Sequence, residues 1–280
     1  MSTESALLGI LTEKIRQDAL VLPTLPEVAV KIRDVADDPA STLHDIARVV
    51  STDTALSARI IRVASTAYNS RSANIDSVST AVFRIGLRAI KNVAIAMALE
   101  QLFISNNQTV KNCLRKIWHQ SISVSCAAVA LSEEYLNTHK RSAISRDRLA
   151  LAGLLHEIGA LPILTEIEVQ APDMISAAFL DNAIEQLSCT VGVHIVRHWN
   201  LGEDFARVVW QWRNQSFQSD DVEYLDFIRL GHLYMQYSEQ QVDVKDELEY
   251  YVDKGVISST DVFLCPEFIN KLAQERTLYE

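Results

Sequence analysis

Apolar residues recur every three or four positions along most of this chain. Residues 6–20, for example, place Leu8, Leu11 and Ile15 on one side of a helix and charged residues on the other. The same spacing recurs over residues 27–37, 42–50 and 55–68. No stretch shows the alternation of a strand, and 8 Gly and 6 Pro leave little turn material for a many-stranded architecture. The pattern therefore predicts an all-α protein.

The polar run SNNQT at residues 105–109 divides the predicted helices into two groups. Before it, residues 78–103 predict two helices that meet near Gly86. After it, we expect helices over residues 112–136, 174–181, 182–199, 204–212 and 222–239, a weaker helical tail to residue 278, and a polar connection over residues 165–173. We therefore predict two packed helical sub-bundles, residues 1–108 and residues 109–280.

The helix predicted over residues 112–136 is rich in Ser, Cys and Ala where the other helices carry Leu. Small side chains allow two helix backbones to approach closely. The helix that begins at Leu149 carries Gly153 and is its natural neighbour. We therefore expect these two helices to cross at short distance.

The run LALAGLLHEIGALP at residues 149–162 carries the first candidates for chemistry. His156 and Glu157 come at the end of an apolar helix. Gly159 suits a left-handed position just past that helix, and Pro162 cannot continue it. The imidazole and the carboxylate would then lie at the C-terminal end of the helix, where both could turn toward one ligand.

The overall charge disfavours several classes of function. A net charge of −10 and a pI near 5.2 argue against a general nucleic-acid binder. The longest apolar runs, such as residues 93–99, are far shorter than the ~20 residues of a membrane span. Residues 1–14 lack the basic start of a secretory signal. We expect a cytoplasmic protein without a membrane partner.

A basic streak could instead suggest a helix-turn-helix DNA-binding unit around Gly86. The helix that follows Gly86 is too apolar to lie in a DNA groove, so a solvated face or a docking surface is the plainer interpretation. The streak consists of Arg59, Arg62, Arg84, Arg88 and Lys91.

The four cysteines show no metal-ligand or disulfide spacing. No CxxC motif occurs among Cys113, Cys126, Cys189 and Cys265. We expect buried free thiols.

Four segments, in this order, resemble an HDOD domain. They are LPTLPEVAVKIRDVADD at residues 22–38, STDTALSARIIRVASTAYN at 51–69, STAVFRIGLRAIKNVAIAMAL at 79–99 and HEIG at 156–159. The resemblance covers residues 22–212. It implies an all-helical bacterial signalling module, related to the HD metal-dependent phosphohydrolases, in which the catalytic metal site is usually degraded. It also implies a regulatory or protein-interaction role, often in nucleotide-second-messenger or stress-response pathways.

The relation to HD phosphohydrolases also implies a set of candidate metal ligands. His119 stands at the place of the family's first histidine, and His156 at that of its His-Asp pair. Glu157 replaces the aspartate of the pair, and His232 stands where a later aspartate is expected, with Asp226 as a weak substitute. Imidazoles and a carboxylate could hold Zn²⁺, Ni²⁺ or Fe²⁺, which would activate a water for attack on phosphorus.

The alternative interpretation of these residues is structural. Glu157 is one methylene longer than the expected aspartate, and catalytic sites tolerate such displacements poorly. His119 and His156 would then hydrogen-bond across a helix crossing, while Glu157 would face solvent or pair with Arg148 or Lys140. No cofactor is expected on this interpretation.

Two further histidine patterns carry less weight. HD-GYP relatives, which hydrolyse cyclic di-GMP, have a histidine where Ser188 stands here and a histidine pair where this chain reads WQWR at residues 210–213. A two-metal diesterase is therefore not expected, and the indole rings would fill the core or a partner surface. His194 and His198 are four residues apart on a predicted helix, but without a suitable carboxylate we expect an exposed or partly packed pair.

Together these features favour a non-catalytic bacterial signalling protein of HDOD type. A cleft between its two sub-bundles would bind a partner protein, or a nucleotide. The alternative is a metal-dependent phosphohydrolase that acts on a nucleotide or phosphate ester through His119, His156 and Glu157. The replaced aspartate favours the first interpretation.

Overall fold

The computed structural model describes residues 3–38, 40–67, 75, 77–170 and 176–279. Within these ranges the chain is helical and forms no strand, which confirms the all-α prediction. The helices are α1 (Thr3–Arg16), α2 (Glu27–Asp37), α3 (Leu43–Val50), α4 (Thr54–Ala67), α5 (Val78–Ile85), α6 (Leu87–Glu100), α7 (Gln108–Thr138), α8 (Arg146–Leu155), α9 (Ala160–Gln170), α10 (Ala177–His198), α11 (Glu203–Gln211), α12 (Tyr224–Gln240), α13 (Lys245–Asp253), the 3₁₀ helix η2 (Val262–Leu264) and α14 (Pro266–Arg276).

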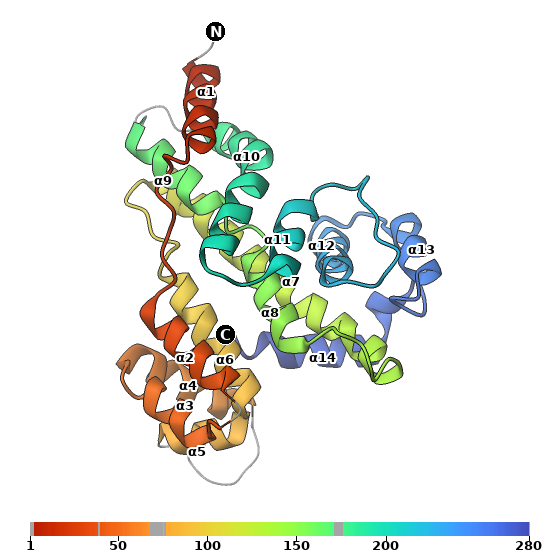
Figure 1. Ribbon diagram of the computed structural model, residues 1–280. Coiled ribbons are helices and arrows are strands. Elements are labelled where there is room, and N and C mark those ends of the chain that lie inside the picture. Colours follow the sequence, from red (N-terminus) through yellow and green to blue (C-terminus); the bar gives the residue numbers. More distant parts are fainter. Residues whose placement is uncertain (1–2, 39, 68–74, 76, 171–175, 280) are drawn as a thin grey trace.

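Helices α2 to α6 form an N-terminal sub-bundle around its own hydrophobic core (Figure 1). The core includes the fully buried side chains of Ile32, Ile46 and Ile60. Helix α3 begins with a capping box in which the Thr42 hydroxyl accepts from the Asp45 amide and the Asp45 carboxylate accepts from the Thr42 amide. The local sequence therefore defines the start of this helix.

Helices α7 to α14 form the second, larger group, organised around α7. Helix α7 has 31 residues and packs against α8, α12 and α14. A Cβ on Gly153 would stand 2.4 Å from the Cα of Ser125, and one on Gly231 would stand 2.8 Å from the carbonyl oxygen of Val124. The expected close crossing of α7 and α8 is confirmed, and α12 makes a similar one on α7.

The two groups are joined more intimately than a boundary at residue 108 suggests. Helix α7 begins at Gln108, at the predicted boundary. Helix α1, however, packs against α9 and α10 of the second group, at the top of Figure 1. At the other end of the chain, Leu278 enters the core of the N-terminal sub-bundle.

Three details of the segment after α8 differ from the sequence-based expectation. Pro162 does not stop a helix: it is the third residue of α9, where the backbone N–H would have no intrahelical acceptor. Helix α9 continues to Gln170, so residues 165–170 of the predicted polar connection are helical. The two helices predicted over residues 174–199 are one helix, α10, and residues 171–175 lie outside the described part of the chain.

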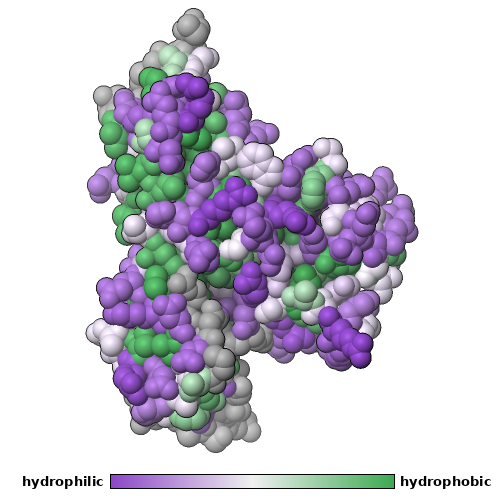
Figure 2. All heavy atoms as spheres, viewed as in Figure 1, coloured by the Kyte–Doolittle hydropathy of each residue, from purple (hydrophilic) through white to green (hydrophobic). Residues whose placement is uncertain are grey.

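The same segment is strongly apolar. Residues 146–170, which contain α8 and α9, are long and apolar enough to cross a membrane by length and composition, but 83% of their most apolar window is buried inside the protein. These helices line the core. Figure 2 shows apolar surface gathered over the region of α9 and the segment that follows α1.

Candidate functional site

Two predicted site residues, His156 and His232, lie side by side in the second group of helices, and we call them the histidine pair. His156 directly follows α8 and is 2% exposed, and His232 lies on α12. The Nδ1 atom of His156 lies 2.6 Å from the carbonyl oxygen of Gly153, and its Nε2 atom lies 2.9 Å from Nε2 of His232. A carbonyl only accepts, so Nδ1 of His156 carries the proton and its Nε2 accepts from His232.

Burial keeps the histidine pair neutral. Desolvation lowers the pKa of His156, and it lowers the pKa of His232 well below its ordinary value, with the nearby His156 as the second cause. Both rings are therefore uncharged near pH 7. The hydrogen bond itself requires a neutral His156, because the Nε2 atom of that ring accepts.

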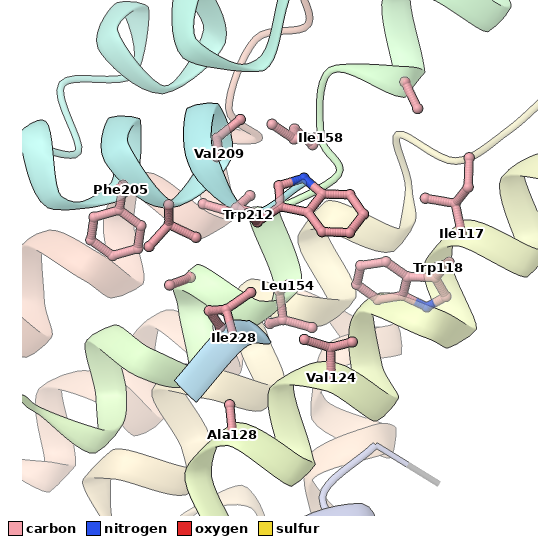
Figure 3. Close-up of a cluster of buried hydrophobic side chains, with 14 of the residues drawn as sticks. Ile117, Trp118, Val124, Ala128, Leu154, Ile158, Phe205, Val209, Trp212 and Ile228 are labelled. Atoms are coloured by element: carbon pink, nitrogen blue, oxygen red, sulfur yellow. The ribbon is translucent and has the colours of Figure 1, made fainter. Parts of the chain in front are cut away.

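An indole ring closes the histidine pair on one side. The ring of Trp212, at the end of α11, stacks on His232 with centroids 4.3 Å apart and meets His156 edge-on at 4.9 Å. Figure 3 shows Trp212 among buried side chains that include Leu154 and Ile158. The second Trp of the WQWR run therefore fills the core, as one of the two sequence-based interpretations predicts, whereas Trp210 is 48% exposed.

Glu157 is bound by two residues outside the histidine pair. Its Oε1 atom accepts from Arg213 Nη2 at 2.7 Å and from Ser188 Oγ at 3.1 Å. The sequence suggested Arg148 or Lys140 as its cation. Arg148 instead pairs with Asp204 at 3.2 Å. The predicted kind of contact is present, but the cation comes from the segment after α11, which the fold brings against α10.

Gly159 places this turn, residues 156–159, directly against α10. A Cβ on Gly159 would stand 1.9 Å from the carbonyl oxygen of Ser188 and 2.6 Å from the backbone N of Gly192. Its φ is not in the left-handed region, which among the described glycines is adopted by Gly86, Gly202 and Gly255. The expectation of a left-handed Gly159 is therefore wrong: glycine is needed here for close approach of two backbones.

His119 lies apart from the histidine pair. It is exposed and lines a cavity of about 400 Å³ between the N-terminal sub-bundle and α7, together with Arg59 and Glu100. The expected hydrogen bond between His119 and His156 does not form, because both ring nitrogens of His156 are bound to Gly153 and His232. The resemblance to HD phosphohydrolases suggested His119 as a metal ligand, and the structure places it on α7 at this cavity.

Asp226, the substitute for the family's later aspartate, is also committed elsewhere. It is 3% exposed, and its two carboxylate oxygens lie 2.8 and 3.0 Å from Lys254 Nζ. One of them also accepts from the Glu223 amide at 2.7 Å, in the capping box of α12. This carboxylate holds α12 and α13 together.

The residues present do not fit a catalytic metal. Two imidazole nitrogens on one tetrahedral zinc lie roughly 3.3 Å apart, given Zn–N bonds of about 2.0–2.1 Å, whereas the two Nε2 atoms are 2.9 Å apart and share a proton. Across the described ranges, no three His, Cys, Asp or Glu side chains come together as a metal site would require. The turn supplies a buried hydrogen-bonded cluster in place of a set of ligands.

The other candidates from the sequence lie on the surface or make no site. His194 and His198 are both exposed on α10. All four cysteines are free, and burial raises the pKa of Cys113 and of Cys189 to about 11. Arg59 of the basic streak donates to the backbone carbonyl of Tyr279, and the side chain of Arg88 lies outside the described part of the structure.

A second cavity, of about 790 Å³, opens beside the histidine pair. It is lined by His232, Trp212 and Arg213 from the cluster, and by Tyr250 and Tyr251 from α13. Arg213 is the residue that sequence reasoning missed. It lies 56 positions from Glu157, and no local spacing connects the two.

A model of the HDOD domain family matches residues 22–214 of the chain. A Shewanella amazonensis protein named "Putative metal-dependent phosphohydrolase" has a similar structure, with 36% sequence identity, a TM-score of 0.86 and 100% of each chain covered. An HDOD domain protein of unknown function from Geobacter sulfurreducens shares the fold at 17% identity, with a TM-score of 0.66 and 99% and 98% of the two chains covered. An uncharacterized protein of Treponema pallidum is 25% identical over 197 residues, which are 67% of this chain but only 37% of that relative.

Proposed function

The chain belongs to the HDOD domain family, and from this premise we propose that it is a non-catalytic, cytoplasmic signalling module of a bacterium. It acts by binding a partner protein rather than by transforming a substrate. Its two sub-bundles, residues 1–108 and residues 109–280, provide the surfaces between which a partner, or a nucleotide second messenger, is recognised. DNA and membranes are not among its partners.

One observation carries this proposal: the polar atoms at the place of an HD metal site are bound to one another. His156 uses one ring nitrogen on Gly153 and the other on His232. Glu157 is neutralised by Arg213, a cation that would oppose a metal ion at the same position. These hydrogen bonds stabilise the fold, and a metal ion could take His156 Nε2 or Glu157 Oε1 as a ligand only by breaking them.

A second candidate function comes from the relative that is 36% identical along the whole chain and is named "Putative metal-dependent phosphohydrolase". On this alternative, a metal would displace the shared proton of the histidine pair. His156, His232 and Glu157 would turn toward the metal, and His119 could join them only by a rearrangement of α7. The metal would supply an activated water for attack on a phosphate ester.

Metal content and hydrolysis distinguish the two functions. The full chain is purified without chelator or metal-affinity resin, then incubated with Zn²⁺, Mn²⁺, Ni²⁺ or Fe²⁺ and desalted. Bound metal is counted by mass spectrometry, and hydrolysis of a phosphomonoester and a phosphodiester is followed. His156→Ala and His232→Ala are the test variants, and His194→Ala is the matched control because it removes an exposed histidine from α10.

We expect the wild-type chain and all three variants to carry the same small amount of metal and to show no hydrolysis above buffer. One equivalent of metal in the wild type and in His194→Ala, lost from both test variants and accompanied by metal-dependent hydrolysis, would refute the proposal. A partner protein captured by the wild type should also be captured by His232→Ala, because the proposed partner surfaces lie on the two sub-bundles and not at the half-buried His232.

A further inference from the structure

The last described residues of the chain, 277–279, are seated in a groove of the N-terminal sub-bundle, and we call them the C-terminal strap. Leu278 is buried in the core of that sub-bundle. Arg59 on α4 donates from its guanidinium to the backbone carbonyl of Tyr279. The Tyr279 ring packs against both hydrophobic cores. The strap therefore bridges the two groups of helices, where the C label lies in Figure 1.

The strap only partly fills the space it covers. The cavity of about 400 Å³ described above lies beside it, between α4 and α6 on one side and α7 on the other. Met97 and Trp118 contribute apolar surface, and Arg59, Arg276 and His119 outnumber the one carboxylate, Glu100. His119 lines this cavity and makes no contact with the histidine pair.

The groove has the chemistry of a receptor for the C-terminal end of a helix. The last carbonyls of a helix have no intrahelical donor and carry the negative end of the helix dipole. The strap continues α14 by one turn, with Leu278 N bound to Glu275 O and Tyr279 N to Arg276 O. Arg59 supplies the missing donor and the complementary charge. An aliphatic and an aromatic side chain, adjacent in sequence, fill the apolar part.

We propose that this groove is the docking site for a partner protein that presents the end of a helix with adjacent aliphatic and aromatic residues. The C-terminal strap occupies the groove in cis, and the partner displaces it. This inference rests on the proposed function and names the surface by which the module binds. The strap can leave without unfolding its helix, because α14 is held by α7 and by the ion pair of Lys271 with Glu133.

A tethered strap competes with the partner for the groove. The apparent affinity of the partner is then its intrinsic affinity multiplied by the fraction of time that the groove is open. If the strap is closed about 99% of the time, the apparent affinity of the partner falls about 100-fold. Release of the strap by mutation should restore that affinity. The strap's own sequence supplies the probe.

The experiment measures binding of a fluorescent peptide of residues 272–280, LAQERTLYE, to the full-length chain by anisotropy. Leu278→Asp releases the strap by placing a carboxylate in its apolar seat. Ile269→Asp is the matched control, because Ile269 is 50% exposed on α14 and lies outside the strap. We expect Leu278→Asp to bind the peptide at least tenfold more tightly than the wild type, and Ile269→Asp to bind like the wild type. Adding Arg59→Ala to Leu278→Asp should remove the gain.

The proposal fails if folded Leu278→Asp binds no more tightly than the wild type, or if Arg59→Ala leaves the gain intact. If Leu278→Asp does not fold, hydrogen exchange of the ¹⁵N-labelled wild type decides. Excess unlabelled peptide should accelerate exchange at the Leu278 and Tyr279 amides at least fivefold, and unchanged exchange overturns the proposal. Phosphoesterase activity at the histidine pair would refute the proposed function but would leave the peptide-binding result unchanged. Absence of peptide binding would refute the docking site but would leave the proposed non-catalytic function standing.

Discussion

Replacement of Gly159 by alanine tests how closely the turn that carries Glu157 lies against α10. The added Cβ would stand 1.9 Å from the Ser188 carbonyl oxygen and 2.6 Å from the Gly192 nitrogen. Both are backbone atoms, so no change of side-chain rotamer can relieve the overlap. Either the turn or α10 must move, and with it the bonds of Glu157 to Ser188 and Arg213.

The expected loss of stability is large for a single methyl group. Overpacking of a core costs about 1–3 kcal/mol when neighbouring side chains can adjust. Because backbone must move here, we expect a loss of about 3 kcal/mol or more. The unfolding entropy is about 2.1 cal/mol/K per residue, so a 280-residue chain that unfolds in one step should melt about 5 °C lower.

Thermal melting followed by circular dichroism measures this difference. Gly9→Ala is the matched control, because Gly9 lies within α1 and a Cβ there would meet nothing within 4 Å. Alanine favours the helix over glycine by about 1 kcal/mol, so this control should melt slightly higher than the wild type. If Gly159→Ala melts within about 1 °C of the wild type, the close contact with α10 is refuted, and with it the reason for glycine at this position.

Three further predictions concern charged and titratable groups. Lys254→Ala should destabilise the chain by about 3–5 kcal/mol, because it leaves the buried Asp226 without its cation. Urea unfolding measures this loss, and the control Lys245→Ala, which removes an exposed lysine, should cost less than about 0.5 kcal/mol. Stability should fall as the pH drops below about 6.5. The folded pKa of each member of the histidine pair is lowered, so below this pH the unfolded chain binds more protons than the folded chain. A melting temperature unchanged between pH 7.5 and 5 would contradict this. Cys113 and Cys189 should alkylate slowly at pH 8, since a pKa of about 11 leaves about one thiolate in a thousand; a rate equal to that of free cysteine, read by mass spectrometry, would show that they are not shielded.

The sequence by itself determined the helices and several of their local features. Helical periodicity is a property of neighbouring residues, so it predicted the all-α class. The capping box of Thr42 and Asp45 needs only a spacing of three. The close approach of α7 and α8 could also be predicted, because the small residues that permit it, including Gly153, are visible in each helix alone.

Only the tertiary structure decided which polar groups meet. The pattern named His156 and Glu157, and the family resemblance added His232. Neither predicted that His156 would bond to His232 across 76 residues or that Arg213 would neutralise Glu157. Periodicity tells which face of a helix is buried. The partner of each side chain depends on the angle and axial offset at which helices cross, and these are set by close packing of the whole core.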